Sequence, residues 1–154
     1  MVLMDLTVTK APAMEINGTT IDDVLETFQL FDDWEDRYRY VIELGGKLAP
    51  LADEAHSAEN KVRGCMSQVW FQATRSDDEP PRLLLEGDSD AMIVKGLIAI
   101  LFLMHSGKTP DEILAVDSEA LLGKLDLAGH LTPMRTNGLF SMLKRIRHLA
   151  AAAR

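Results

Sequence analysis

Two stretches near the start of the chain place their apolar residues at helical spacing. The first stretch, residues 21–31, has one apolar face made of Ile21, Val24, Leu25 and Phe28. Thr20, with Asp23 three positions later, is a weak capping signal for its start. The second stretch runs from Asp32 or Asp33 to Leu44, and its apolar stripe is made of Trp34, Tyr38, Val41 and Ile42. The pattern predicts two helices, the second ending at Gly45 and Gly46.

The middle of the chain has a composition typical of strands. Residues 68–72 are aromatic and β-branched, and residues 82–86 form a short run rich in leucine. Between them lies a charged segment with two adjacent prolines, Pro80 and Pro81, which is typical of a loop. We therefore predict a hairpin of two strands, after which the chain turns again at Gly87.

The second half of the chain has the pattern of helices. Residues 91–104 form the longest apolar run, which Lys95 interrupts and which is shorter than the roughly 20 residues of a membrane span. This run predicts a core helix that Ser89 or Asp90 caps and that stops at Gly107.

Two further helix starts follow the core helix. Thr109, Pro110 and Glu112 combine an N-cap, a proline at the first helical position and a glutamate at the third. Thr132 before Pro133 opens a final helix. The whole pattern predicts an α+β fold, with a small, mostly antiparallel sheet packed against several helices.

Chain length and the N-terminal residues bear on domain organisation and location. A chain of 154 residues is large enough for one domain that buries about two thirds of its unfolded surface. Residues 1–19 are mixed, small and polar, so we predict a flexible tail followed by a single domain at 20–154, with Met14 as an alternative start. The tail resembles neither a secretory signal nor a transit peptide, which predicts a cytoplasmic protein without a membrane segment.

Charge is strongly acidic and unevenly distributed. The net charge of −8 argues against nucleic acid as the main partner. Residues 20–60 hold eleven Asp/Glu against three Lys/Arg, whereas residues 135–154 hold five Lys/Arg and no acid. The distribution is typical of a solvated acidic face and a basic last helix, which the helix dipole favours. The alternative is a dipolar surface that orients a protein partner.

The chain has one cysteine, Cys65, and this excludes most cysteine chemistry. It rules out an intramolecular disulfide, a CxxC redox pair and a cysteine-ligated metal site. A buried structural residue or a nucleophilic thiol that exchanges sulfur with another molecule remains. Gly64 allows a sharp turn before it, at a predicted junction of loop and strand. Lys61 and Arg63 lie on its side of an extended segment, where positive charge would favour the thiolate.

Other polar residues allow more than one interpretation. Asp88 and Asp90 could be metal ligands or acid–base groups, but helix capping is the commoner role. Arg135 lies in the first turn of the last helix, where a cation is mildly unfavourable, so pairing with an internal or partner carboxylate would explain it. His56 could act as a base near Cys65, although a solvated loop histidine is the simpler interpretation.

Four blocks of sequence, in order, resemble one family. Residues 62–70, Val-Arg-Gly-Cys-Met-Ser-Gln-Val-Trp, resemble the cysteine motif of SufE-type sulfur-acceptor proteins (the SufE/CsdE family). Residues 34–45, 87–97 and 131–139 resemble three further blocks of that family, and the likeness covers roughly residues 21–150. Two departures are Met66, where the family often has Gln, and Met134, where a small polar residue is usual.

The resemblance implies both a fold and a function. The fold would be SufE/IscU-like, with a third strand. Cys65 would accept persulfide sulfur from a SufS-like cysteine desulfurase, activate that enzyme and pass the sulfur to a SufB-like iron–sulfur scaffold complex. The protein would need no cofactor, because pyridoxal phosphate belongs to the desulfurase. Five further residues match the family's motifs as loop support or partner-binding positions: Arg63, Gly64, Asp88, Asp90 and Arg135.

Three alternatives remain open at this point. A paralogous, CsdE-like acceptor would serve another sulfur pathway such as tRNA modification. A non-catalytic regulator would bind the desulfurase without needing the thiol. A one-cysteine peroxidase is disfavoured because no recognisable Thr/Pro/Arg peroxide pocket accompanies Cys65.

Overall fold

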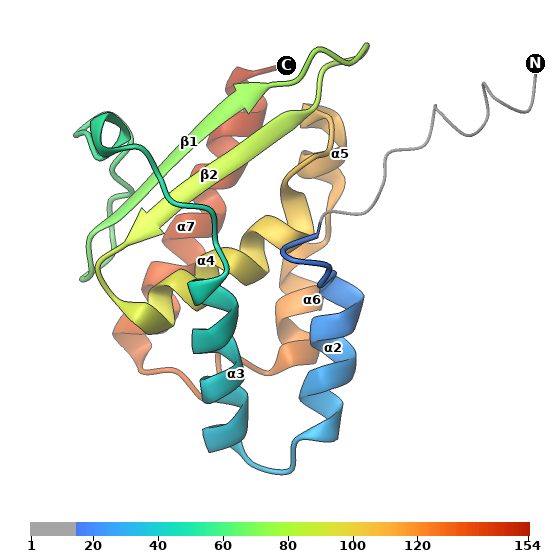
Figure 1. The fold of residues 1–154 in the computed structure, drawn as a ribbon, viewed down its shortest axis with the longest axis vertical. Helices are drawn as coiled ribbons and strands as arrows, with labels where there is room; N and C mark the ends of the chain where they lie inside the picture. Colours follow the sequence, from blue (N-terminus) through green and yellow to red (C-terminus); the bar gives the residue numbers. More distant parts are fainter. Residues whose placement is uncertain (1–14) are drawn as a thin grey trace, which may run out of the picture.

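The computed structural model describes residues 15–154, which form six helices, one 3-10 turn and a two-stranded hairpin. The elements follow the order α2 (Ile21–Leu30), α3 (Trp34–Gly46), the 3-10 turn η1 (Asp53–Ala55), β1 (Val69–Arg75), β2 (Leu83–Ser89), α4 (Met92–His105), α5 (Pro110–Ala115), α6 (Ser118–Leu125) and α7 (Pro133–Ala152). Figure 1 shows the hairpin running across one side of the group of helices. The predicted α+β fold with a small antiparallel sheet is confirmed.

The hairpin packs one face on the helices and leaves the other toward solvent. Val69, Phe71, Leu83 and Leu85 are buried, and they alternate along the strands with more exposed residues. The predicted turn at Gly87 is wrong, because β2 continues through Gly87 to Ser89.

Packing explains the glycine inside β2. Gly87 lies opposite Phe71, and a Cβ atom at Gly87 would lie 2.8 Å from the Phe71 ring and 2.9 Å from the Phe102 ring. The residue therefore serves close packing between the hairpin and α4 rather than a turn.

Helix α4 forms the centre of the core. It is apolar on all sides, and its residues from Gly96 to His105 are all buried. It crosses α3 at two glycines, where the nitrogen of Gly96 would lie 2.5 Å from a Cβ atom at Gly45. The small residues let the backbones of α3 and α4 approach closely, which fixes the position of α4, one of the helices that line the thiol pocket.

Several helix starts agree with the sequence signals. Thr20 and Asp23 form a capping box at α2, and Thr109 and Glu112 form another at α5. Thr132 caps α7 through a bond from the backbone N–H of Arg135. None of the described helices is both long and apolar enough to cross a membrane.

The predicted cap of α4 is wrong. The N-cap is Ala91, which has no capping side chain. The Ser89 hydroxyl instead accepts a bond from the Ala91 N–H, and the Asp90 carboxylate accepts one from the Gln68 N–H. Both side chains are engaged before the helix begins, because the chain turns tightly from β2 into α4.

The implied third strand is also absent from residues 15–154, where the sheet has two strands. Next to β1 there is only an isolated bridge between Lys61 and Trp70. The segment around Lys61 pairs with β1 over a short length only, because it follows one turn near residue 58 and enters another at Gly64.

Residues 16–19 form part of the described fold. Ile16 is buried in the core, and a tight turn at Asn17 and Gly18 is closed by mutual backbone bonds between Ile16 and Thr19. The predicted tail therefore does not extend to residue 19. The rest of that prediction, and the alternative start at Met14, lie outside the described residues.

Candidate functional site

Cys65 lies on a short loop that the backbone closes at both ends. The Val62 N–H donates to the Val69 carbonyl at 2.8 Å, so residues 63–68 form the tip of a hairpin-like turn before β1. Gly64 adopts φ +88°, a left-handed conformation that glycine adopts without strain. The predicted position of the thiol, at a junction of loop and strand, is confirmed.

The thiol lies against the backbone of α7. Its Sγ is 3.6 Å from the Gly138 carbonyl oxygen, which it can contact as a weak donor. Ser141, one turn further along α7, donates from its hydroxyl to the Gly64 carbonyl at 3.5 Å. The thiol is a weak donor and the Ser141 bond is long, so these two contacts hold the tip of the loop only weakly.

A small pocket shelters the sulfur. It has a volume of about 120 Å³ and opens beside Cys65 between the loop, α4 and α7. Its apolar lining comes from Val94 and Leu97 of α4 and from Met134 and Met142 of α7. Met66 is largely exposed at the same pocket. Both departures from the family motif, Met66 and Met134, thus border the thiol.

Burial raises the pKa of the Cys65 thiol above its usual value. The expectation that Lys61 and Arg63 favour the thiolate is therefore wrong for this conformation. Arg63 is exposed and borders a different pocket, so its charge acts largely through solvent. Burial therefore favours the protonated, less reactive form of the thiol.

Arg135 shares the thiol pocket with Cys65. Its side chain borders this pocket and a neighbouring one that includes Tyr38 and His130. No carboxylate within residues 15–154 forms an ion pair with Arg135, so the predicted internal pairing is not found. Pairing with a partner carboxylate stays a prediction.

Asp90 fixes the downstream end of the Cys65 loop. Its carboxylate accepts a bond from the Gln68 N–H at 3.0 Å, and its own N–H donates to the Gln68 carbonyl at 3.3 Å. The turn between β2 and α4 is therefore tied directly to the cysteine loop. The Asp90 carboxylate therefore bonds to the backbone of the cysteine loop and does not cap α4.

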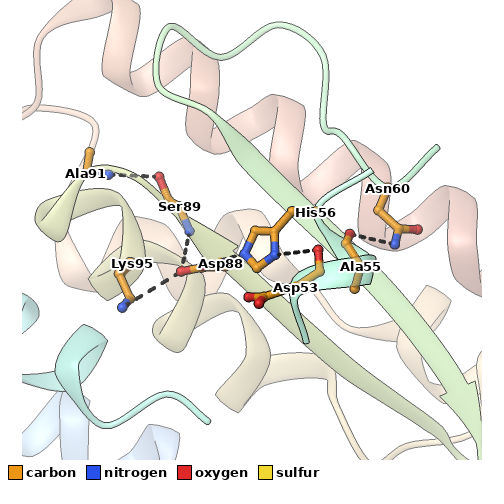
Figure 2. A network of polar contacts seen from close by, with 8 residues as sticks. All are labelled: Asp53, Ala55, His56, Asn60, Asp88, Ser89, Ala91 and Lys95. Carbon is orange, nitrogen blue, oxygen red and sulfur yellow. Dashed lines mark hydrogen bonds and ion pairs between the residues drawn. The ribbon is translucent and has the colours of Figure 1, made fainter. Parts of the chain in front are cut away.

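Asp88 is the centre of a polar network rather than a helix cap (Figure 2). Its carboxylate lies 2.7 Å from His56 Nε2 and 3.8 Å from Lys95 Nζ, and it accepts a bond from the Ser89 N–H at 2.8 Å. The His56 ring also packs edge-on against Trp70, with centroids 4.7 Å apart. His56 is thus a paired residue and not a solvated loop histidine.

The network shifts both titrating groups. The hydrogen bond to Asp88 raises the pKa of His56 above its usual value. Partial burial acts to raise the pKa of Asp88, but bonds from His56 and the Ser89 N–H, with the Lys95 charge, lower it overall. The pair ties His56, in the segment before Cys65, to Asp88 of β2.

Sequence reasoning missed Ser141 and Arg145 on α7. The Arg145 guanidinium donates to the carbonyls of Glu59 and Lys61, upstream of Cys65. Gly138, Ser141 and Arg145 are spaced by three and four residues, which puts them on one helical face. That spacing was visible in the sequence, but nothing indicated that the face would meet the cysteine loop.

The fold and the site define a small α+β protein that shelters a single thiol on a loop. A family model described as SufE, an Fe-S metabolism associated domain, matches residues 22–150. An uncharacterized SufE-like protein of Rhizobium etli is 51% identical over 132 residues, covering 85% of this chain and 89% of the relative. One of Rhizobium meliloti is 47% identical over 130 residues, covering 84% and 93%. The chain belongs to the SufE family.

A solved structure agrees with this fold. The solution structure of a hypothetical protein from Thermus thermophilus has a TM-score of 0.69. It is 22% identical in sequence and covers 86% of this chain and 94% of that one. At this identity the likeness concerns the fold alone.

Proposed function

We propose that this protein is a sulfur carrier that takes persulfide sulfur from a cysteine desulfurase onto Cys65. It activates that enzyme and passes the sulfur to iron–sulfur cluster assembly. The observation that carries the proposal is the single thiol, sheltered in an apolar pocket on a loop whose tip is weakly held. Membership of the SufE family, whose model is associated with Fe-S metabolism, supports it.

The transfer is a sulfur exchange with no net oxidation. The Cys65 thiolate attacks the terminal sulfur of the persulfide on the desulfurase cysteine. A new S–S bond forms to Cys65, the old S–S bond breaks, and its electron pair returns to the desulfurase cysteine as a thiolate. Removing this sulfur frees the desulfurase for another turnover, which would explain activation.

Because the pKa of Cys65 is raised, the partner must also make the thiol easier to ionise. In the docked loop the thiol is mostly protonated and faces an apolar pocket, so it is a poor nucleophile. A partner that draws the loop out returns the sulfur to water and lets it ionise at its ordinary pKa. Protection and activation then follow from one movement.

The partners follow from the same proposal. The donor is a SufS-like desulfurase that carries the pyridoxal phosphate, and the acceptor is a SufB-like scaffold complex. The carrier itself contributes a thiol and no cofactor.

Stimulation of the desulfurase tests this function. Cys65→Ser should keep the fold, because serine replaces a half-buried side chain with one of similar shape, yet it should abolish stimulation. Thr74→Ser, at an exposed position of β1 outside the thiol pocket, is the control and should stimulate normally. If Cys65→Ser stimulates as well as the control, the protein is a regulator and the carrier proposal fails.

A further inference from the structure

A second pocket lies between the Cys65 loop and α7 and shares no lining residue with the thiol pocket. It has a volume of about 440 Å³. Four basic side chains line it: Arg63 from the loop and Lys144, Arg145 and His148 from α7. We call it the basic pocket.

The positive charge of the basic pocket is not neutralised within the described part of the chain. None of its four basic side chains forms an ion pair there. Arg145 bonds only to the backbone carbonyls of Glu59 and Lys61, and its Nε is buried without a hydrogen-bond partner. Arg63, Lys144 and Arg145 carry positive charge and line one pocket, so an anion that enters it is attracted by all three.

We propose that the basic pocket is a docking site for a carboxylate-rich segment of a protein partner. An acidic segment complements its charge, and guanidinium groups bind carboxylates through strong, charge-assisted bonds. A long polyanion such as a nucleic acid fits less well, because it would also meet the rest of a molecule whose net charge is −8. The identity of the protein that carries this segment, the sulfur donor or the sulfur acceptor, rests on the proposed function. The docking site itself does not.

The location of the basic pocket couples docking to the thiol. Arg63 is two residues from Cys65 and moves with the loop, whereas Lys144, Arg145 and His148 belong to α7. The affinity for an acidic segment therefore depends on the position of the loop, and a bound segment in turn changes the preferred position of the loop. Docking at this pocket and exposure of the thiol are linked in this way.

A binding experiment on the full chain tests the docking site without any desulfurase. Fluorescence anisotropy with a labelled hexaglutamate peptide should show saturable binding at low salt that weakens as salt is added. The double variant Arg63→Glu with Lys144→Glu should bind about tenfold more weakly. Both side chains are exposed, so the fold should survive, as circular dichroism would verify.

The matched control is Lys47→Glu with Lys124→Glu, which makes the same change of charge at exposed positions outside the pocket. It should bind within about twofold of the unaltered protein. Equal losses in both double variants would mean a general effect of net charge and overturn the proposal. So would an absence of saturable binding at low salt, or tighter binding of an oligothymidylate of equal charge. Because sulfur transfer is not measured, failure here would leave the proposed function standing.

Discussion

The reactivity of Cys65 is set by a few neighbouring atoms. Gly64 turns the chain in a left-handed conformation, the Gly138 backbone meets the sulfur, and Met134 and Met142 wall the pocket. Burial there raises the pKa of the thiol, so the same contacts that exclude solvent also hold the proton on. Burial of the Cys65 side chain thus both protects the thiol from solvent and lowers its reactivity.

We predict slow alkylation of Cys65 in the free protein. At neutral pH a raised pKa leaves less thiolate than in an unfolded chain, and the docked loop limits access. Iodoacetamide labelling followed by mass spectrometry should be slower in buffer than in urea, and faster when a desulfurase is added. Equal rates with and without the desulfurase would remove the idea of a loop that the partner opens.

Gly64→Ala should destabilise the protein by about 1–2 kcal/mol, because an alanine resists the φ of +88° found there. An added Cβ would also lie 2.5 Å from the Ser141 hydroxyl. Gly123→Ala in α6 is the control, since it has open space around it and should stabilise by about 0.5–1 kcal/mol. Urea denaturation measures both; a Gly64→Ala protein as stable as the original would contradict the assigned backbone role.

Among the elements, a buried histidine connects the C-terminal end of α4 to the start of α6. His105 is fully buried, its Nδ1 donates to the Leu101 carbonyl at 2.7 Å, and its Nε2 accepts from the Ser118 hydroxyl at 2.7 Å. Nδ1 must carry the proton because a carbonyl can only accept. Burial lowers the pKa of His105 to about 4.

This histidine predicts a loss of stability in acid. The folded pKa lies below the unfolded value of 6.5, so its contribution is complete above pH 6.5 and is lost as pH falls toward 4. The loss approaches about 1.4 kcal/mol for each pH unit across that window. Urea denaturation from pH 7 to pH 4 should show stability falling with pH, and His105→Gln should make the fall smaller. An unchanged slope in the variant would assign acid sensitivity to other groups.

The sequence predicts features that depend on residues close together in the chain better than features that depend on contacts between distant elements. The capping boxes at Thr20 and Thr109 involve residues three apart, and both were predicted. Gly87 was mistaken for a turn because its cause, the rings of Phe71 and Phe102, comes from other elements. The pairing of His56 with Asp88 spans 32 residues and was likewise beyond local pattern. Helix α6 was not predicted at all.

In the whole molecule, the Cys65 loop is held by contacts from several elements. The Cys65 loop is anchored by Asp90 at one end and by Arg145 upstream, while its tip rests lightly on α7. Family motifs had indicated Cys65, Gly64 and the acidic pair, and the structure brings them to this loop. It also adds Ser141 and Arg145 of α7, which lie beyond the family block at residues 131–139.

Arg135 borders the thiol pocket, and no acidic side chain among the described residues pairs with it. Arg135→Ala should weaken sulfur transfer more than it lowers Tm, and the loss should shrink at high salt, where the wild-type contact is screened. Arg39→Ala, on the surface of α3, is the control for a lost arginine. Lowered Tm with normal transfer at low temperature would make Arg135 a fold residue.

The decisive measurement is the intact mass of the protein after incubation with a cysteine desulfurase and free cysteine. We expect the protein to gain the mass of one sulfur atom, peptide mapping to place that sulfur on Cys65, and a reductant to remove it. Cys65→Ser should gain nothing under the same conditions. If the protein stimulates the desulfurase while its mass stays unchanged at every time point, Cys65 does not carry sulfur and the proposed function is wrong.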